Sequence, residues 1–369
     1  MAGPIRVLHI LQRMEAGGIQ AFLMNLYRNI DRSKVQFDFL VEYQEKQFYD
    51  DEIEKMGGRI YRSSIHNDYN IVKFNRFLDE FFRMHNEYKV VHVHAYTIGY
   101  FCLRAASRAG VPVRIAHAHT KGIIHDKKYP LKKIMKMLYS AYATDLFACS
   151  EEAGRYFFGN KEYSIIKNGI DPKKFIANAE TRKYMRQSLG MENRLVIGNI
   201  GRLHESKNQT FLLHLFAVLH ESHPHAALLI VGAGPLEKKL KEESRRLNLT
   251  NSVQFLSNRR DIPQLMQAMD VVVLPSLFEG LGIVAIEAQA AGVPAVCSTG
   301  FPPDIEITSL VTRKELSAPL QSWAESILRQ ANNPTRHTDT FKTIVDAGFD
   351  IKNTAQIIQK YYINKYVSN

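Results

Sequence analysis

Residues 279–287, which read EGLGIVAIE, decide the fold class of this chain. They follow the apolar run 270–275 (DVVVLP), which predicts a buried parallel strand, and lead into 288–291 (AQAA), which predicts a helix. A strand, a glycine-bearing turn and a helix start form an anion site, because free backbone N–H groups point outward and the helix dipole adds roughly half a positive charge. Glu279 and Glu287 flank this site, so it suits a phosphate-bearing ligand with hydroxyl groups at both ends, such as a nucleotide sugar.

The same alternation of apolar strands, turns and helical segments runs through both halves of the chain. Such alternation is typical of parallel sheets with right-handed crossovers. We therefore predict an α/β protein with two doubly wound, Rossmann-like domains that bind ligands at the carboxyl ends of their strands, facing a central cleft. The predicted strands are 5–11, 37–41, 60–61, 90–94, 113–117, 145–149, 164–166, 195–200, 227–231, 252–256, 271–274 and 295–297, and the main predicted helices are 20–29, 50–56, 71–86, 100–109, 129–143, 209–220, 236–247 and 262–268.

The length of 369 residues also indicates two domains. We expect an N-terminal domain over residues 1–180 and a C-terminal domain over 190–350, with a polar connection at 184–193. The tail is expected to form a helix, at about 351–369, that packs back on the first domain. The turn at 168–172 (NGIDP) lies at the crossing between the halves, where it is expected to border the cleft.

Composition and charge limit the partners of the chain. The net charge of +11 indicates a polyanionic partner, but no basic region interleaved with aromatic residues occurs on a recognisable nucleic-acid fold, so we expect no nucleic acid. No apolar run approaches the roughly 18–20 residues of a membrane span, and the start does not resemble a signal peptide. Cys102, Cys149 and Cys297 are far apart and odd in number, which predicts reduced, mostly buried thiols in a cytoplasmic protein.

Residues 201–208 (GRLHESKN) follow a predicted strand and place two cations, Arg202 and Lys207, at its carboxyl end. Paired cations suit a diphosphate, because negative charge builds on its oxygens as it leaves. The alternative is a solvated loop with a surface salt bridge to Glu205. The anion site at 280–284 in the same domain favours the diphosphate.

The two carboxylates of the opening motif, Glu279 and Glu287, are eight residues apart. A helical segment would separate them by about 12 Å, beyond the roughly 5–9.5 Å of paired glycosidase carboxylates. We therefore expect separate duties, one at the sugar and one at a ribose. The alternative is that Glu287 is an acidic residue near the helix N-terminus that interacts favourably with the helix dipole and binds no ligand.

Four histidines occur in two alternating pairs, His92 with His94 and His117 with His119, each pair on one side of a predicted strand. One hypothesis is a zinc or two-metal site of the HxH type. Against it, no carboxylate follows at close spacing and no DxD pattern occurs in the chain, so we expect no metal. A histidine at a strand end facing the cleft would instead donate a hydrogen bond to a sugar hydroxyl, and any one of the four alone is more often structural.

Gly17 and Gly18 form a turn between the first strand and the first helix. The surrounding residues do not match GxGxxG, which disfavours an NAD enzyme. We expect the tight turn to line the cleft and expect no cofactor.

Residues 127–142 combine lysines with apolar residues at helical spacing. One interpretation is an ordinary surface helix whose apolar side lies in the core. The other is a helix that lies on an anionic membrane, which would make the protein peripheral on the inner face of the cell membrane. The lysines are Lys127, Lys128, Lys132, Lys133 and Lys136, and the apolar residues expected on one face are Leu131, Ile134, Met135, Leu138 and Tyr142.

Three strings together resemble the retaining GT4-family glycosyltransferases with two Rossmann-like domains (GT-B fold), over nearly the whole chain. They are NGID (168–171), GRLHESKN (201–208) and EGLGIVAIEAQAAGVPAVCS (279–298). The nearest subgroup is that of bacterial exopolysaccharide and capsule synthesis. The resemblance implies metal-independent transfer of a hexose from a UDP- or GDP-sugar to a glycan acceptor, lipid-linked in the family-based expectation, with retention of anomeric configuration. It also implies that the first domain binds the acceptor and the second binds the donor.

The resemblance further implies a role for each matching residue. Gly17 and Gly18 lie in the turn near the donor phosphates, and His119, with His117 as the fallback, matches the histidine that contacts the donor sugar. Glu279 matches the carboxylate near the transferred sugar, and Glu287 the one that holds the ribose hydroxyls. The phosphate-binding set comprises Arg202 and Lys207 through their side chains and Gly282, Ile283 and Val284 through their backbone.

One departure concerns the stretch 298–304 (STGFPPD), where many relatives have a glycine-rich turn followed by an acidic residue. We expect this region to influence the choice of acceptor or sugar. Two rival hypotheses remain open: a non-catalytic GT-B partner subunit of a sister glycosyltransferase, and a phosphatase or epimerase that uses the histidines. Intact Arg202, Lys207, Glu279 and Glu287 count against the first.

Overall fold

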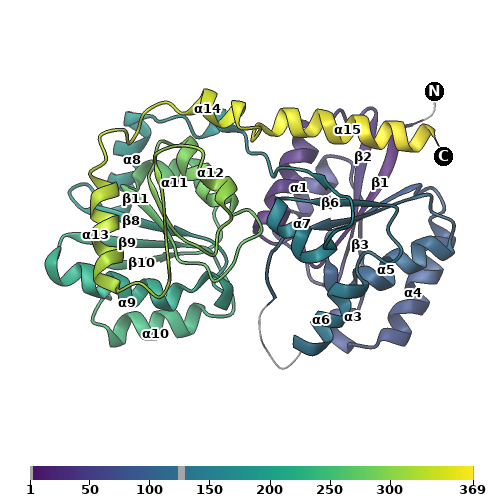
Figure 1. Ribbon diagram of the computed structural model, residues 1–369, viewed down its shortest axis with the longest axis horizontal. Helices are drawn as coiled ribbons and strands as arrows, with labels where there is room; N and C mark the ends of the chain where they lie inside the picture. Colours follow the sequence, from purple (N-terminus) through teal and green to yellow (C-terminus); the bar gives the residue numbers. More distant parts are fainter. Residues whose placement is uncertain (1–2, 124–128, 369) are drawn as a thin grey trace. The chain divides into compact units, whose positions relative to one another are not determined.

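The computed structural model describes residues 3–123 and 129–368, which form two compact units (Figure 1). The first unit comprises Met1–Gly169 with Ile351–Asn369, and the second comprises Ile170–Asp350. The boundary lies ahead of the residue 180 expected from the sequence, because Ile170 pairs with Asp350 in a parallel bridge and its N–H donates to the carbonyl of Phe349 at 2.8 Å.

The first unit is built on a seven-stranded sheet in the order β3-β2-β1-β4-β5-β6-β7, with every pair parallel. Apolar and β-branched residues dominate these short runs, as expected for strands that are covered on both faces. The strands are β1 (Ile5–Leu11), β2 (Val35–Val41), β3 (Ile60–Arg62), β4 (Val90–Val93), β5 (Val113–Ala118), β6 (Asp145–Ala148) and β7 (Ser164–Ile165).

Helices cover both faces of this sheet. The C-terminal helix α15 (Ile351–Val367) packs against α1 (Gly18–Asn29) and contacts β1, β2 and β4, so the end of the chain contributes to the core of the first unit. The other helices are α2 (Asp50–Lys55), α3 (Ile65–Asp68), α4 (Ile71–Met84), α5 (Tyr96–Arg108), α6 (Tyr129–Leu138) and α7 (Glu151–Phe158).

The second unit has a six-stranded parallel sheet in the order β10-β9-β8-β11-β12-β13. Its strands are β8 (Leu195–Ile200), β9 (Ala226–Val231), β10 (Val253–Leu256), β11 (Val271–Leu274), β12 (Ala295–Ser298) and β13 (Val311–Lys314). Its α-helices are α8 (Ala179–Leu189), α9 (Gln209–Ser222), α10 (Glu237–Arg246), α11 (Ile262–Ala268), α12 (Ile283–Ala290), α13 (Leu320–Ala331) and α14 (Phe341–Asp346).

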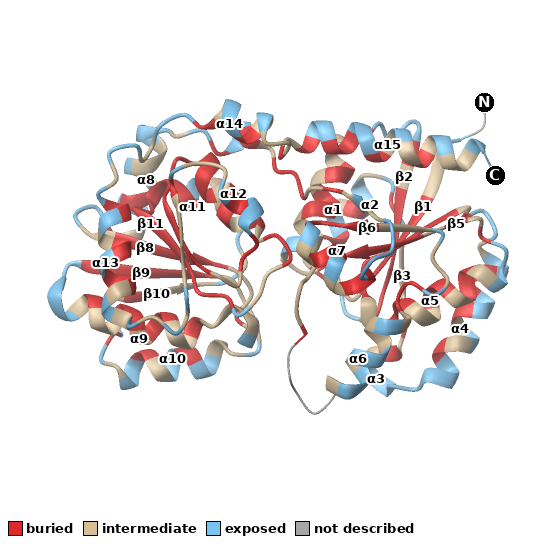
Figure 2. Ribbon diagram, viewed as in Figure 1, coloured by how far each residue is buried: buried red, intermediate tan, exposed pale blue. Residues whose placement is uncertain are grey.

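The central strands of both sheets are buried within their own units, as the red strands of Figure 2 show, whereas the edge strands β3, β7, β10 and β13 are mostly half-buried. Their parallel order confirms the predicted fold class of two doubly wound, Rossmann-like domains. The expected polar connection at 184–193 is wrong in part, because α8 occupies residues up to Leu189. The Asn178 side chain caps its start by accepting from the Thr181 N–H, and Gly190 ends it in a left-handed conformation.

Candidate active site

In the second unit, the loops after β8 and β9 pack backbone against backbone at the carboxyl edge of the sheet. Gly201 N–H donates to Val231 O at 2.9 Å, and Leu203 N–H donates to Ala233 O at 3.0 Å. Gly232 has φ +141°, and a Cβ atom there would lie 2.1 Å from Gly201 O. A side chain at 232 would therefore push apart the loop that carries Arg202 and Lys207.

Lys207 and Glu279, which are 72 positions apart in the chain, form an ion pair at this edge. Ser276 Oγ donates to the same carboxylate at 2.7 Å, and Glu279 N–H donates to Gly300 O at 2.9 Å. The side chain of Lys207 is 30 % exposed and that of Glu279 is 13 % exposed. The lysine thus pairs with a motif carboxylate, not with Glu205 as in the solvated-loop alternative. Partial burial strengthens the field of both charges on a bound ion.

The loop that carries Lys207 is also tied directly to the loop that follows β11. Leu277 N–H donates to Ser206 O at 2.8 Å. Arg202 is half-buried, and its carbonyl accepts from Gln209 Nε2 at 3.0 Å at the start of α9. The structure therefore brings the GRLHESKN and EGLGIVAIE motifs together at one edge of one sheet.

The start of α12 fits the predicted anion site. Gly282 precedes the helix with φ +85°, and a Cβ atom there would lie 2.1 Å from a ring carbon of Phe301, so only glycine fits. Ile283 and Val284 are its first two residues, whose N–H groups have no acceptor in a preceding turn. No side chain caps the helix, which leaves these dipoles available to an anion.

Glu287 lies in the second turn of α12 and is half-buried. Burial raises the pKa of its carboxyl to about 8. Among the described residues its carboxyl has no hydrogen-bond or ion-pair partner. The first turn holds no acidic residue, so the alternative of an early helix acid held by the dipole is not supported.

In the first unit, the carboxyl edge of the sheet gathers imidazoles instead of ions. His9 of β1 lies in register with His92 of β4, and His94 follows β4 directly. His117 lies on β5, and His119 comes just after it. Four of these side chains are buried and His119 is half-buried.

Four hydrogen bonds link these imidazoles and one tyrosine. His9 Nδ1 lies 3.0 Å from His94 Nε2, and His94 Nδ1 lies 2.8 Å from His119 Nε2. His92 Nε2 lies 3.0 Å from His117 Nδ1, and His92 Nδ1 lies 2.6 Å from the hydroxyl of Tyr362 on α15.

Alternation along the strands predicts the pairing of the four later histidines, but it does not predict that His9 and Tyr362 join them. The parallel register of β1 beside β4 is the signal that would have placed His9. Burial lowers the pKa of His9 and His119 to about 3 and, as the largest cause, lowers the pKa of His92, His94 and His117 well below the ordinary value. All five are therefore neutral near pH 7.

Neutral imidazoles are also the form that binds metals. Two groups of three, His9 with His92 and His94, and His94 with His117 and His119, place ligand atoms within 4.8 Å of one another. Their nitrogens, however, already bond to one another at 2.8–3.0 Å. No carboxylate belongs to either group, and the expectation of no metal stays a prediction.

The glycine turn follows β1 as predicted. Gly17 is the extended residue that precedes α1, and Gly18 is the first residue of the helix. A Cβ atom at Gly18 would meet no atom within 4 Å. Packing within the protein therefore does not require glycine at position 18, and open space lies beside the backbone there.

The lysine-rich segment proves to be an exposed helix. None of the described residues of α6 is buried, and Leu131, Ile134 and Met137 are 57 %, 51 % and 72 % exposed. The interpretation that its apolar side lies in the core is therefore wrong for Leu131 and Ile134, whereas Met135 and Leu138 are half-buried and α6 packs against α5. The helix ends at Leu138, so Tyr142 lies beyond it; Lys127 and Lys128 lie outside the described residues.

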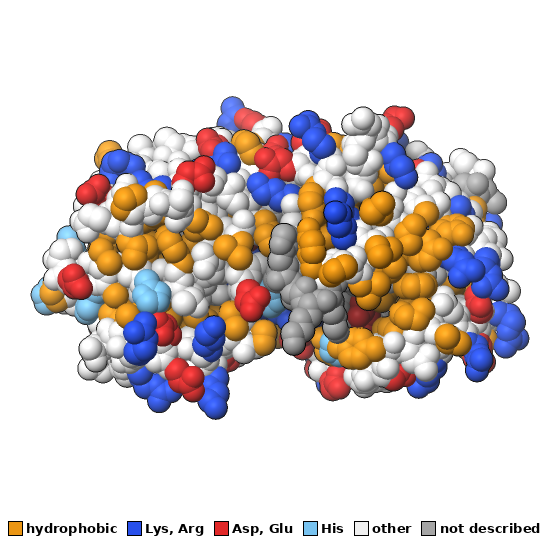
Figure 3. Space-filling model, turned by 60° about the horizontal axis from the view of Figure 1, so that its bottom comes forward, with side chains coloured by type: hydrophobic (Ala, Val, Ile, Leu, Met, Phe, Trp, Pro, Cys, Tyr) orange, Lys and Arg blue, Asp and Glu red, His pale blue; other side chains and the backbone are white. Residues whose placement is uncertain are grey.

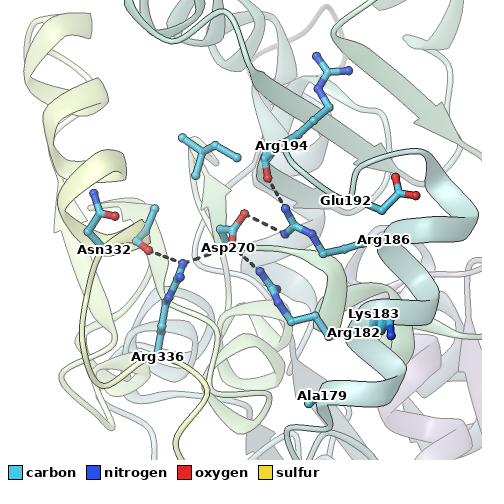
Figure 4. Close-up of a pocket in the computed structure, with 11 residues that line it drawn as sticks. Ala179, Arg182, Lys183, Arg186, Glu192, Arg194, Asp270, Asn332 and Arg336 are labelled. Atoms are coloured by element: carbon cyan, nitrogen blue, oxygen red, sulfur yellow. Dashed lines mark hydrogen bonds and ion pairs between the residues drawn. The ribbon is translucent and has the colours of Figure 1, made fainter.

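The arginine-rich pocket of about 500 Å³ in Figure 4 lies at the opposite, amino-terminal edge of the second sheet. Asp270, directly before β11, accepts from Arg182 at 2.6 Å and from Arg186 at 3.1 Å. Arg336 bonds the same carboxylate at 3.2 Å. These arginines also bond backbone carbonyls at and just after the end of α11 and α13, which indicates a structural junction.

Comparisons with known proteins agree with this geometry. Residues 180–337 match the family described as "Glycosyl transferases group 1", and residues 16–174 match "Glycosyltransferase Family 4". The chain is 37 % identical over 372 residues to EpsF of Bacillus subtilis (strain 168), which is named as a glycosyltransferase, and 97 % of each chain is covered. It is 30 % identical over 224 residues, 58 % of each chain, to the Escherichia coli UDP-Gal:alpha-D-GlcNAc-diphosphoundecaprenol alpha-1,3-galactosyltransferase.

Solved structures share the whole architecture. Anabaena Alr3699/HepE in complex with UDP and glucose superposes with a TM-score of 0.80 at 21 % identity, covering 97 % of this chain and 99 % of that one. WaaG, involved in lipopolysaccharide biosynthesis, gives 0.73 at 18 % identity, covering 96 % and 99 %. The chain belongs to the group 1 and family 4 glycosyltransferases and is an enzyme with the GT-B fold. In the described residues, no helix combines the length and the apolarity needed to cross a bilayer.

Proposed function

We propose that the enzyme transfers a hexose from a UDP- or GDP-sugar to a lipid-linked glycan, with retention of configuration, in exopolysaccharide or capsule synthesis. The second unit would bind the donor and the first unit the acceptor. The observation that carries the proposal is the Lys207–Glu279 pair at the same sheet edge as the uncapped start of α12.

The donor diphosphate would lie at the N-terminus of α12. Backbone N–H groups of Gly282, Ile283 and Val284 would bind its oxygens, and Lys207 and Arg202 would neutralise the charge that builds as the nucleoside diphosphate leaves. These cations and dipoles supply the stabilisation that a metal gives in other transferases, so we propose transfer without a metal or cofactor. Added chelator would then leave the transfer rate unchanged.

The two carboxylates would act at opposite ends of the donor. Glu279 is held by Lys207 and Ser276, which suits a fixed acceptor for hydroxyls of the transferred sugar. The Glu287 carboxyl has no hydrogen-bond or ion-pair partner among the described residues, so it is available to bind two ribose hydroxyls. The first unit would contribute His119 to the sugar. The backbone at Gly18, where a Cβ atom would meet no atom within 4 Å, would admit the phosphates closely, with Gly17 in the same turn.

Names of relatives support the finer parts of the proposal. The E. coli relative is named for UDP-Gal and for an acceptor that is a sugar on diphosphoundecaprenol. HepE, which shares the fold, was solved with UDP-glucose. EpsF, which is named as a glycosyltransferase, is similar over almost the whole chain. The exopolysaccharide or capsule role that we propose rests on the resemblance of the sequence motifs to that subgroup.

A lipid-linked acceptor requires access to a membrane, and α6 offers a surface for it. Exposed Leu131, Ile134 and Met137 share the helix with Lys132 and Lys133. Figure 3 brings this side of the molecule forward and shows apolar side chains open on the surface of the first unit. We propose that α6 lies on an anionic membrane, with apolar residues inserted and lysines at the headgroups.

Calorimetry with UDP and GDP tests the proposal, followed by a hydrolysis screen over UDP- and GDP-sugars. We expect one nucleotide to bind the wild-type protein and Lys207→Ala to weaken that binding strongly. Lys239→Ala on the exposed face of α10 is the matched control and should bind as the wild type does. A protein that binds neither nucleotide would contradict the proposal and favour a non-catalytic partner subunit.

A further inference from the structure

The chain that follows β12 packs behind both parts of the proposed donor site. It reads STGF over residues 298–301, and Phe301 is its one bulky side chain. Phe301 is 1 % exposed, so its ring lies inside the second unit and does not face a ligand. Any effect of this ring on the reaction must therefore pass through the residues that it contacts.

The ring of Phe301 fills the space beside Gly282, the residue before α12. A Cβ atom at position 282 would lie 2.1 Å from Cε1 and 2.3 Å from Cδ1 of this ring. Gly282 has φ +85°, and a glycine without such a neighbour adopts left-handed and right-handed conformations about equally. Packing of the ring against Gly282 therefore holds the turn in the conformation from which α12 starts.

The same segment supports Glu279 through its backbone. Gly300 O accepts from the Glu279 N–H at 2.9 Å, and the Gly300 N–H donates to Ser298 Oγ at 3.2 Å. Ser298 Oγ donates to Ser276 O, and Ser276 Oγ donates to the Glu279 carboxylate at 2.7 Å. A Cβ atom at position 300 would lie 2.5 Å from Ser276 O, so this close approach of two loops requires glycine.

A second anchor joins the chain beyond Phe301 to the body of α12. The buried Gln289 donates through Nε2 to Ile305 O at 2.9 Å and accepts through Oε1 from the Thr308 N–H at 3.0 Å. These bonds do not involve the Phe301 ring. Loss of the ring would therefore leave this segment attached to α12 and loosen the turn at Gly282.

We propose that Phe301 is a positioning residue for donor binding, which fixes the phosphate-binding turn at Gly282 relative to Glu279. This inference rests on the proposed function, because that proposal places the diphosphate at the start of α12. A turn that is already ordered in the free protein binds more tightly, since the ligand does not have to order it. Removal of the ring should then weaken nucleotide binding while the unit stays folded.

A matched pair of core substitutions separates this role from a merely structural one. Phe216 on α9 is also 1 % exposed and belongs to the hydrophobic core of the same unit. We expect Phe301→Leu and Phe216→Leu to lower the melting temperature similarly. Only Phe301→Leu should bind UDP or GDP about tenfold more weakly, the cost of ordering the backbone of about one residue. Equal losses of nucleotide affinity in the two variants, or no loss in Phe301→Leu, would overturn the proposal.

Amide hydrogen exchange measures the same loosening without a ligand. The Glu279 N–H, which donates to Gly300 O, should exchange about tenfold faster in Phe301→Leu than in the wild type. In Phe216→Leu it should exchange at the wild-type rate. Unchanged exchange of this amide in Phe301→Leu, or equal acceleration in both variants, would overturn the proposal.

A double-mutant cycle tests the contact between the ring and the turn. Gly282→Ala combines a left-handed conformation, which by itself costs about tenfold, with a collision against the Phe301 ring. In otherwise wild-type protein, Gly282→Ala should weaken nucleotide binding about a hundredfold or more. In the Phe301→Ala background it should weaken binding only about tenfold further. Equal losses in the two backgrounds would overturn the proposal, and if Phe301→Ala does not fold, the leucine pair still decides.

The wild-type protein separates failure of this inference from failure of the proposed function. If it binds neither UDP nor GDP, the proposed function is refuted, and exchange of the Glu279 amide still tests whether Phe301 holds the turn. If it binds one nucleotide and Phe301→Leu binds that nucleotide equally well, the inference is refuted and the proposed function stands.

Discussion

The two units share one architecture but differ in charge at corresponding edges of their sheets, one of which carries ionic groups and the other neutral groups. The carboxyl edge of the second sheet carries an ion pair, Lys207 with Glu279, and an uncapped helix start. The carboxyl edge of the first sheet carries neutral, hydrogen-bonded imidazoles and no ion pair among them. The same fold therefore carries charged groups at this edge in one unit and neutral hydrogen-bonding groups in the other. The proposed function uses this difference, with the diphosphate at the charged edge and sugar hydroxyls at the neutral one.

The largest expected effect comes from removing the cation of the second unit. Lys207→Ala should lower the transfer rate about 10²–10³-fold, because one oriented donor to the leaving group is lost. Its circular dichroism and melting temperature should stay close to those of the wild type, since the lysine is partly exposed. Steady-state kinetics measure the loss, and full activity in Lys207→Ala would contradict the assignment.

That site could be predicted from the sequence because its parts lie in contiguous motifs. Residues 279–287 contain the turn, the helix start and both carboxylates, and 201–208 contain both cations. The sequence did not predict the partner of Lys207, because the ion pair spans 72 positions and depends on how two loops meet. Loops that follow adjacent parallel strands can contact each other. β8 and β11 are adjacent, so the contact can be expected once the strand order is known.

The site in the first unit was harder to predict. Its imidazoles come from three strands, and Tyr362 comes from the last helix of the chain. Alternation along one strand paired His92 with His94, but no local pattern joins either of them to His9. The helix α8 was also not predicted, because its short polar sequence shows no apolar periodicity. Its start is fixed by the Asn178 cap and its end by the left-handed Gly190.

The second prediction concerns the unpaired carboxyl of α12. Burial raises the pKa of Glu287 to about 8, so the group is mostly protonated at pH 7. The proposed binding of two ribose hydroxyls favours the ionised form, because only that form accepts from both without a proton of its own. Nucleotide affinity should therefore rise about tenfold between pH 7 and pH 9, with release of a proton on binding at pH 7. Glu287→Gln should bind ten- to hundredfold more weakly and lose this pH dependence, as calorimetry in buffers of different ionisation enthalpy would show.

The same carboxyl gives a prediction for stability. Because its folded-state pKa is raised above the ordinary 4.5, the unfolded chain ionises first, and the free energy of unfolding falls as pH rises from about 4.5 to about 8. Glu287→Gln removes this penalty. Urea titrations should find the variant equal to the wild type near pH 4.5 and more stable, by a few kcal/mol at most, at pH 8. A variant less stable than the wild type at pH 8 would contradict the cause assigned to the pKa.

The third prediction tests the neutral edge. His119→Ala should lower kcat about tenfold and leave the affinity for the nucleoside diphosphate, UDP or GDP, unchanged, because the lost bond goes to the sugar and not to the nucleotide. His119→Asn, which keeps an amide donor near Nδ1, should recover part of the loss. Loss of nucleotide affinity in His119→Ala would contradict the assignment of His119 to the sugar part of the donor alone.

The smallest expected effect lies on α6. Lys133→Ala should weaken binding to vesicles of phosphatidylglycerol and phosphatidylcholine about fivefold, the value of one lysine near an anionic surface. Flotation assays would measure it, with Lys239→Ala as the matched exposed control. Wild-type protein that stays entirely in solution with these vesicles would refute the membrane role of the helix.

A crystal structure of the protein with UDP or GDP bound tests the central claim most directly. We predict the diphosphate at the N-terminus of α12, within hydrogen-bond distance of the Ile283 and Val284 N–H groups and of Lys207 Nζ, with the ribose hydroxyls on Glu287. A diphosphate bound elsewhere, with the start of α12 closed by the protein's own side chains, would contradict the account.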